Sequence, residues 1–269
     1  MSKKGIYTLT NNWSLNGFAL LKRAPDVPKE VVYKCMPANY AIDFICNGNF
    51  FIANPKTWDD PYEMKFIDKA DYKNHPKFQQ PKATYCTCFT NKPANEASWI
   101  TYSYKRSGIE SRSIKIKIGV NPFLDFVDQK LRGLKLIDPA IYWGKVKYDL
   151  TKKSIDTLPK KSSVYHNDFF NPLTWDRYAD LLLIKRKDFD YEHECRLIVL
   201  CNSDEEKGLI ISFSDYELNK LIEEVLIDPR CTPLEVELLK YQILKKIKDP
   251  SKVKQYPLYQ KSVTKFIVE

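Results

Sequence analysis

One stretch of the chain carries strong signals of both fold and chemistry: Tyr191-Glu192-His193-Glu194-Cys195-Arg196-Leu197-Ile198-Val199-Leu200. Its second half is an unbroken apolar run, typical of a buried strand. We therefore predict a strand over residues 191–200 in the centre of its sheet. The strands expected at residues 33–35 and 225–228 are predicted to flank it.

The charged half of this stretch has the spacing of a strand face. Side chains alternate along a strand, so Glu192, Glu194 and Arg196 are expected on one face at intervals of about 6.6 Å. Tyr191 and Cys195 would then face the core. Two adjacent carboxylates raise each other's pKa, while a guanidinium lowers that of at least one. Such a pair suits a sugar hydroxyl and a developing oxocarbenium ion; an exposed strand with an ordinary Glu–Arg ion pair is the alternative.

The remaining elements are interspersed without the regular alternation of a doubly wound sheet, which favours an α+β fold. Strands are expected at residues 31–35, 50–52, 83–89, 114–118, 141–148 and 224–228, and helices at 37–47, 97–104, 171–184 and after capping boxes at Ser214 and Thr232. The alternation of residues 114–118 predicts a strand with one face in solvent. We predict an arm over residues 1–30 and a single domain over 31–269. That domain has a split, mostly antiparallel sheet flanked by helices and ends in a basic helical segment.

Charge points to a polyanionic partner. The net charge is +9, and residues 240–265 alone contain eight lysines and one acidic residue, Asp249. A second basic stretch, residues 145–161, has six lysines against Asp149 and Asp156. Such segments attract the phosphates of nucleic acids. A lysine-rich face that only meets solvent is the alternative.

Composition excludes several classes of protein. A hydrophobic content of 43% excludes general disorder, and no apolar run is long enough for a membrane span or a signal peptide. A cytoplasmic protein with no membrane partner is therefore expected. Only eight glycines are present, and no glycine-rich phosphate loop is found. The seven cysteines lack the spacing of a zinc site, so we expect buried, reduced thiols and no metal.

Two further groups of residues are candidates for chemistry. Trp99 and Tyr102 share a helical face, with Arg106 one turn later, which suits a heteroaromatic ring joined to a phosphate; a pair of core aromatics is the alternative. Residues 54–63 contain Asp60-Pro61, which favours a structural turn where Asp59 or Asp60 accepts backbone N–H bonds. Metal binding by this turn is the weaker interpretation.

The order of these features resembles the bacterial domain of unknown function 2971 family over roughly residues 31–230. The residues that carry the resemblance are Tyr33-Lys34, Gly48, Trp58, Asp60-Pro61, Glu63, Cys88-Phe89-Thr90, Trp99, Tyr102, Gly108-Ile109, Lys185, Tyr191-Glu192, Glu194, Arg196 and Ile222–Ile227. Trp58-Asp59-Asp60 stands where the family more often has Phe-Asn-Asp. The family name implies no activity.

The same order is more distantly similar to ADP-ribosyltransferases, which implies a fold like theirs and NAD as co-substrate. Carried over by position, the resemblance implies that Glu194, with Glu192, is catalytic. It implies an NAD-binding role for Lys34 on the first strand and for Tyr102 or Ser103 in the middle motif. Trp99 and Arg196 are further candidate residues for binding NAD. Lys34 stands where these enzymes have His or Arg.

The expected function is therefore an NAD-dependent ADP-ribosyltransferase-like enzyme of a bacterial defence or toxin type, with nucleic acid as a candidate acceptor. One alternative is a metal-dependent protein that binds or cleaves nucleic acid, with Glu192, Glu194, Asp60 and Glu63 as ligands. The other is a catalytically inert interaction domain on the same scaffold.

Overall fold

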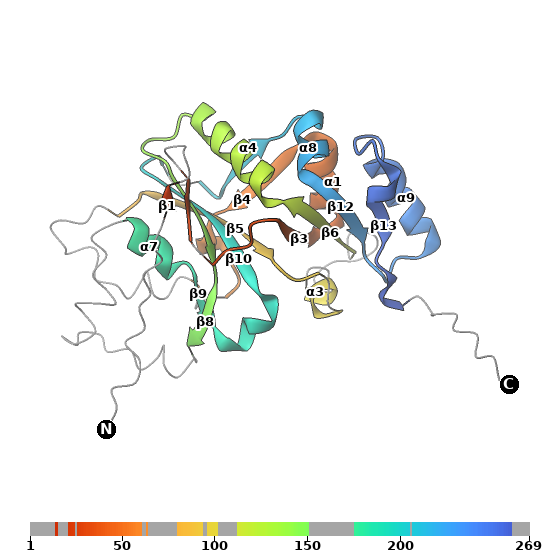
Figure 1. Ribbon diagram of the computed structural model, residues 1–269, viewed down its shortest axis with the longest axis horizontal. Coiled ribbons are helices and arrows are strands. Elements are labelled where there is room, and N and C mark those ends of the chain that lie inside the picture. Colours follow the sequence, from red (N-terminus) through yellow and green to blue (C-terminus); the bar gives the residue numbers. More distant parts are fainter. Residues whose placement is uncertain are drawn as a thin grey trace, which may run out of the picture. The chain divides into compact units, whose positions relative to one another are not determined.

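The computed structural model describes residues 14–15, 21–24, 26–60, 63, 80–93, 96–101, 112–150, 175–204 and 206–259. The chain forms two compact units, each assembled from three stretches of sequence. Unit 1 contains residues 1–32, 50–92 and 120–211, and unit 2 contains residues 33–49, 93–119 and 212–269. Strands and helices are mixed along the chain (Figure 1), which confirms the α+β class.

The sheet of unit 1 is built around β10 (Glu194–Cys201). This strand pairs antiparallel with β5 (Ala83–Thr90) on one side and β7 (Ala140–Lys145) on the other. Beyond β7 lie β2 (Leu21–Arg23), which is parallel to it, and β1 (Ser14–Leu15). β4 (Asn49–Ala53) pairs with β5, and β11 (Gly208–Ser212) pairs with β4. The sheet is therefore mixed, with mainly antiparallel pairs.

Two details of the prediction for residues 191–200 are wrong. The strand is central, but its neighbours are β5 and β7, not residues 33–35 and 225–228, because an apolar run does not specify which strands pair with it. The strand also begins later. Residues Lys187–Glu192 form the 3₁₀ helix η4, with Asp188 and Asp190 in its first turn, where carboxylates favour a helical start.

Both faces of β10 are buried. On one face, Phe89 of β5 packs edge-on against Phe123 of α4 (Val120–Gly133) and against Trp143 of β7, with ring centroids 5.2 and 5.4 Å apart. On the other face, Ile198 belongs to an apolar cluster with Tyr178 of α7 (Trp175–Leu181). Next to this cluster, β8 (Lys147–Leu150) pairs in parallel with β9 (Ile184–Arg186).

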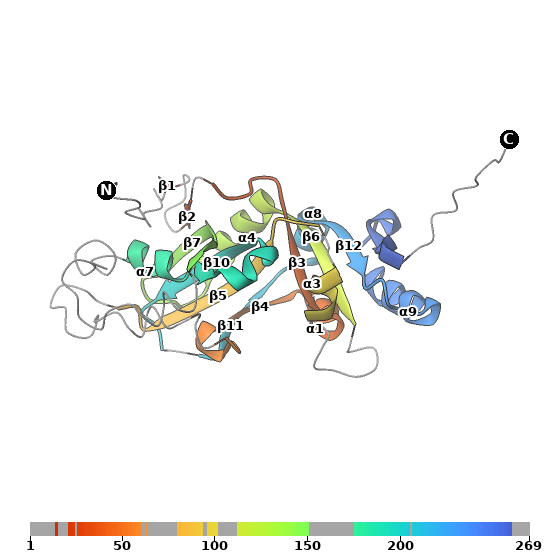
Figure 2. The ribbon, with the colours of Figure 1, turned by 90° about the horizontal axis from the view of Figure 1, so that it is seen from below.

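Unit 2 contains β3 (Val31–Pro37), of which the first two residues are counted with unit 1, and three further strands. β12 (Ile222–Ile227) pairs antiparallel with β6 (Ser113–Gly119) and parallel with β13 (Val253–Gln255). Figure 2 shows β3, β6 and β12 side by side. The solvent-facing side predicted for residues 114–118 is found only at Lys117, whose side chain is 30% exposed. Lys115 is only 1% exposed, because its ammonium donates to the Pro93 carbonyl (3.0 Å) and the Ser98 hydroxyl (3.4 Å).

The starts of two helices and the end of a third in unit 2 lie where the sequence predicts. Ser214 and Thr232 form capping boxes that open α8 (Asp215–Leu221) and α9 (Pro233–Ile243). The helix α1 (Ala38–Asn47) ends at Gly48, whose φ of 77° is in the left-handed region that favours glycine. A Cβ at Gly48 would lie 2.1 Å from the Phe213 carbonyl oxygen, so the close approach of this backbone also requires glycine.

The basic C-terminal segment is helical only in part. After α9 the chain forms the 3₁₀ helices η5 (Pro250–Lys252) and η6 (Pro257–Tyr259), with β13 between them. The short helix α3 (Glu96–Thr101) matches the expected start of a helix near residue 97. Most of the basic stretch 145–161, and the expected start of a helix at Asn171-Pro172, lie outside the described residues. The division into an arm and a single domain remains a prediction.

Candidate functional site: a buried cluster of charged residues

Five charged side chains of unit 1 meet in one network, which we call the charged cluster: Glu63, Lys185, Glu192, Glu194 and Arg196. Three of them come from strands, Lys185 from β9 and Glu194 and Arg196 from β10. Glu192 is the last residue of η4. The cluster thus unites residues that lie up to 133 positions apart in sequence.

Arg196 is the buried centre of the cluster, with 0% exposure. Its Nε and Nη2 donate to Oε2 of Glu194 at 3.0 and 2.7 Å, and Nη2 also donates to Oε2 of Glu63 at 2.5 Å. Nη1 donates to the carbonyl oxygen of Leu182 at 2.7 Å. The ring of Trp58 lies 4.9 Å from the guanidinium carbon. The guanidinium is therefore held by hydrogen bonds in its plane and by an aromatic ring over its face.

Lys185 joins the same carboxylates from β9. Its Nζ lies 2.5 Å from Oε2 of Glu192, 3.1 Å from Oε1 of Glu63 and 3.4 Å from Oε1 of Glu194. The Phe189 ring centroid is 4.7 Å from the ammonium. Burial lowers the pKa of Lys185, but the three carboxylates outweigh burial and the pKa is raised. Lys185 is therefore a charged ammonium that links Glu192 to Glu194.

A turn at His193 places the two glutamates. His193 has a φ of 46°, which is uncommon for a residue other than glycine, and its N–H donates to the Asp190 carbonyl oxygen at 3.2 Å. Glu192 therefore ends a 3₁₀ helix while Glu194 begins a strand, yet both carboxylates reach Lys185. The backbone N–H of Glu194 is fixed by the Tyr148 hydroxyl oxygen, which accepts from it at 2.8 Å.

The charges of the cluster do not balance, and the two glutamates respond in opposite directions. Three carboxylates face two cations. Burial and the charge of Glu194 raise the pKa of Glu192 to about 7, although Lys185 opposes the rise. Burial would also raise the pKa of Glu194, but Arg196 and Lys185 outweigh it and hold that pKa below its usual value. The cluster thus pairs a permanently ionised carboxylate with one that exchanges a proton near neutral pH.

Glu192 and Glu194 also differ in their exposure to solvent. The Glu192 side chain is 23% exposed, whereas those of Glu63, Lys185 and Glu194 are at most 9% exposed. Burying several charges is costly unless they are paired, and pKa values split by such an arrangement are typical of functional sites. Glu192 is therefore the most solvent-accessible of these four side chains.

The predicted site residues are only partly brought together. Glu192, Glu194 and Arg196 converge. Lys34 lies on β3 in unit 2, and Trp99 lies in α3, 1% exposed, with its ring 5.7 Å from that of Tyr256. Tyr102, Ser103 and Arg106 lie outside the described residues. The NAD-binding roles of Lys34, Trp99, Tyr102 and Ser103 therefore remain predictions.

Sequence reasoning assigned no role to Lys185 or Tyr148. A signal for Lys185 exists, since it follows the apolar run Leu181–Ile184, and a lysine beside such a run is a candidate for a buried cation. No local signal distinguishes Tyr148 from the other tyrosines, because its partner Glu194 is distant in sequence.

The turn at residues 54–63 is stabilised by an asparagine. Oδ1 of Asn54 accepts the backbone N–H of Lys56 at 3.0 Å, while Asp60 forms an ion pair with Arg186 at 3.1 Å. Glu63 joins the charged cluster at the end of this turn. No group of His, Cys, Asp and Glu suited to a metal ion is found within the described part of the chain. All seven cysteines are free thiols, and five are buried.

Comparison of the chain with protein-family models, with curated proteins and with solved structures found no match. Among the described residues, no helix has the length and apolar character needed to cross a membrane.

Proposed function

We propose that the charged cluster is the active site of a glycosyl-transfer enzyme that uses NAD as the donor of ADP-ribose. The observation that carries the proposal is the contact of one ammonium, Lys185, with two carboxylates of opposite pKa shift. Such a split assigns one carboxylate to electrostatic stabilisation and the other to proton transfer. The resemblance of residues 191–196 to the late strand of ADP-ribosyltransferases favours the same assignment.

In this mechanism Glu194 remains ionised while the bond between nicotinamide and ribose breaks and the bonding electron pair leaves with nicotinamide. Positive charge develops on the ribose, and a fixed negative charge stabilises it. The acceptor then bonds to the anomeric carbon and releases a proton, which Glu192 takes up. A base with a pKa near 7 is suited to that step.

Arg196 and Lys185 act as positioning residues. Arg196 is fully buried, so it serves the site by orienting Glu194 and keeping it ionised, not by contacting a phosphate of NAD. This differs from the NAD-binding role expected for Arg196 from the sequence. Glu192, the exposed member, is the residue that fits direct contact with a substrate.

The test is NAD turnover by three variants. Glu194→Gln is expected to lower the rate by 10²–10³, the cost of one lost electrostatic contact, and Glu192→Gln is expected to remove the rise of the rate through about pH 7. Glu30→Gln is the matched control, because Glu30 is exposed and lies outside the charged cluster. NAD consumption and label transfer to nucleic acid or protein are measured, with a melting curve for each variant.

Stability must be followed because Glu194 is 7% exposed. A loss of about 1–3 kcal/mol is expected from Glu194→Gln, as for a buried hydrogen-bonded charge. A folded Glu194→Gln protein with full NAD-dependent activity would contradict the proposal. Cleavage of nucleic acid that needs magnesium or manganese and no NAD would support the metal-dependent alternative. A lower melting temperature with no activity in the wild type would indicate a structural ion-pair cluster in an interaction domain.

A further inference from the structure

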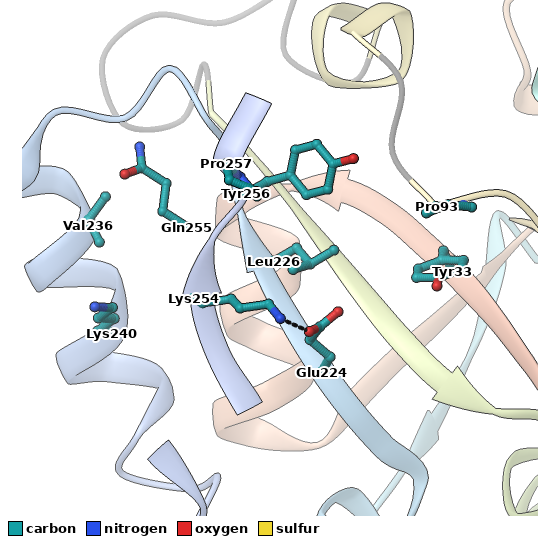
Figure 3. A pocket seen from close by; sticks show the side chains of 10 residues that line it. All are labelled: Tyr33, Pro93, Glu224, Leu226, Val236, Lys240, Lys254, Gln255, Tyr256 and Pro257. Atoms are coloured by element: carbon teal, nitrogen blue, oxygen red, sulfur yellow. Dashed lines mark ion pairs between the residues drawn. The ribbon is translucent and has the colours of Figure 1, made fainter. Parts of the chain in front are cut away.

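Unit 2 contains a pocket of about 610 Å³ that the proposed reaction does not use. Its walls come from three strands, from α9 and from two prolines: Tyr33, Pro93, Glu224, Leu226, Val236, Lys240, Lys254, Gln255, Tyr256 and Pro257 (Figure 3). The volume is in the range of sites that hold small organic groups. Five of the ten lining residues belong to the basic segment 240–265.

The strand register explains why polar and aromatic residues gather at this pocket. Leu226 pairs with Lys115 of β6 and with Lys254 of β13, and Glu224 pairs with Lys117. Paired residues of neighbouring strands project on the same side of a sheet. One face of unit 2 therefore carries three lysines, one glutamate and Leu226. Figure 3 shows Tyr256 and Lys254 on the same side as Leu226.

The opposite face is apolar. Ile114 and Ile116 of β6, and Val225 and Ile227 of β12, alternate with the residues above and are 0% exposed. α1 contacts β6 and α8 contacts β12, and Figure 3 shows a helix behind the strands as seen from the pocket, whereas α9 lines the pocket itself. Unit 2 is thus a sheet of four strands with helices behind it and a hollowed, basic front face.

Two tyrosines flank the hollow. Tyr33 is half-buried, with the Lys115 ammonium 5.7 Å from its ring centroid. Tyr256 is also half-buried and is held in place by its N–H, which donates to the Ile227 carbonyl oxygen at 3.0 Å, and by its contact with Trp99. β3 and β13 are three strand spacings apart, which is roughly 14 Å. Aromatic side chains along one face of a sheet are suited to the stacking of successive bases.

The lysines at the pocket are placed for phosphates. The side chain of Lys254 is 56% exposed and forms an ion pair with Glu224, which is 24% exposed. Lys240 is 33% exposed and lies 3.6 Å from Glu237. Ion pairs with this degree of exposure are weak, so a polyanion can compete for both ammoniums.

We propose that this front face binds single-stranded nucleic acid, with bases against Tyr33 and Tyr256 and phosphates at Lys240 and Lys254. One class of RNA-binding domain uses a four-stranded sheet in this way and stacks two or three bases on the aromatic side chains of the sheet. The charge of segment 240–265, eight lysines against one acidic residue, complements a nucleic acid. The inference does not depend on the reaction proposed above, because binding is measured without NAD.

The experiment measures fluorescence anisotropy of a labelled ten-nucleotide oligothymidine with the full chain at two salt concentrations. Lys254→Glu is expected to weaken binding about tenfold or more and to lower the salt slope by about one. Lys248→Glu is the matched control, since it makes the same charge change in the same segment at an exposed residue that does not line the pocket. Glu224→Gln is expected to strengthen binding several-fold, because it releases Lys254.

Stacking is tested at Tyr33. Tyr33→Ala is expected to weaken binding about tenfold and Tyr33→Phe to keep it, because the aromatic face makes the contact. Circular dichroism melting checks that each variant is folded, and Glu224→Gln tests the site even if Tyr33→Ala unfolds. Equal losses from Lys254→Glu and Lys248→Glu would overturn the proposal. So would equal binding of a duplex of the same length, or equal competition by polyglutamate, which would indicate a general surface for polyanions or acidic proteins.

Discussion

The charged cluster of unit 1 and the front face of unit 2 use the same residue types in opposite surroundings. In the cluster, Arg196 is 0% and Lys185 8% exposed, and both are surrounded by carboxylates and aromatic rings. On the front face, Lys254 is 56% exposed and its partner Glu224 is 24% exposed. The number of ion pairs is therefore a poor guide to their effect. Burial determines whether an ion pair fixes a protonation state or can give way to a ligand.

The largest expected effect is on the cluster. Arg196→Met removes the cation that Glu63 and Glu194 share and leaves both carboxylates short of charge compensation. We expect the free energy of unfolding to fall by about 3–5 kcal/mol, whereas Lys254→Ala should change it by no more than about 1 kcal/mol. Urea denaturation of both variants measures the difference. Equal losses of unfolding free energy in the two variants would contradict the difference that we infer between the two regions.

The next effect is a pH dependence that only the cluster should show. The pKa of Glu192 is raised from 4.5 to about 7 by folding, so the folded state binds more protons between these values. The free energy of unfolding should therefore fall as pH rises from about 4.5 to 7, by an amount on the order of 1–3 kcal/mol. Glu194 has a lowered pKa and acts in the opposite direction, with stability lost as pH falls below about 4.5.

Glu192→Gln isolates this contribution. The difference in unfolding free energy between wild type and variant, measured from pH 4 to 8, should decline with pH over the interval from about 4.5 to 7. Contributions of carboxylates outside the charged cluster cancel in that difference. Glu224→Gln on the front face is the control, and the same slope there would count against a tuned carboxylate in the cluster.

The smallest effect concerns the helix that lines the pocket. The Thr232 hydroxyl accepts the Glu235 N–H at 3.3 Å, and Glu235 in turn accepts the Thr232 N–H at 2.7 Å. Thr232→Ala should lower the free energy of unfolding by about 1 kcal/mol, the usual contribution of such a cap. Chemical denaturation measures it, and Thr232→Ser should restore most of the loss. A loss below about 0.3 kcal/mol would show that the cap contributes little beyond the packing of α9.

The sequence predicts those features whose causes are local. The capping boxes at Ser214 and Thr232, the end of α1 at Gly48 and the strand at β12 depend on residues a few positions apart, and all are confirmed. Strand neighbours depend on contacts between distant residues, which is why the partners of β10 were predicted wrongly.

In the candidate site, too, local features could be predicted from the sequence and contacts between distant residues could not. The proximity of Glu194 and Arg196 follows from alternation along a strand. The turn at His193 could not be predicted from the sequence, because nothing in the neighbouring residues requires a φ of 46° there. The alternation of residues 114–118 predicts Lys115 in solvent. The side chain is buried because its ammonium donates to the Pro93 carbonyl oxygen, a contact that periodicity cannot reveal. Glu63 contacts Arg196 across 133 positions, which no spacing rule could anticipate.

The alternation of the chain between its two units has a consequence for synthesis. β6 is translated about a hundred residues before its partner β12, and the whole of the third unit 1 stretch, residues 120–211, lies between them. During translation the edge of β6 that pairs with β12 thus stays open until residues 222–227 are made. Unit 1 needs residues up to 211 and unit 2 needs β12 and β13, so neither unit can be completed while the chain is shorter than that. A nascent chain halted near residue 190 would therefore be a natural client for chaperones.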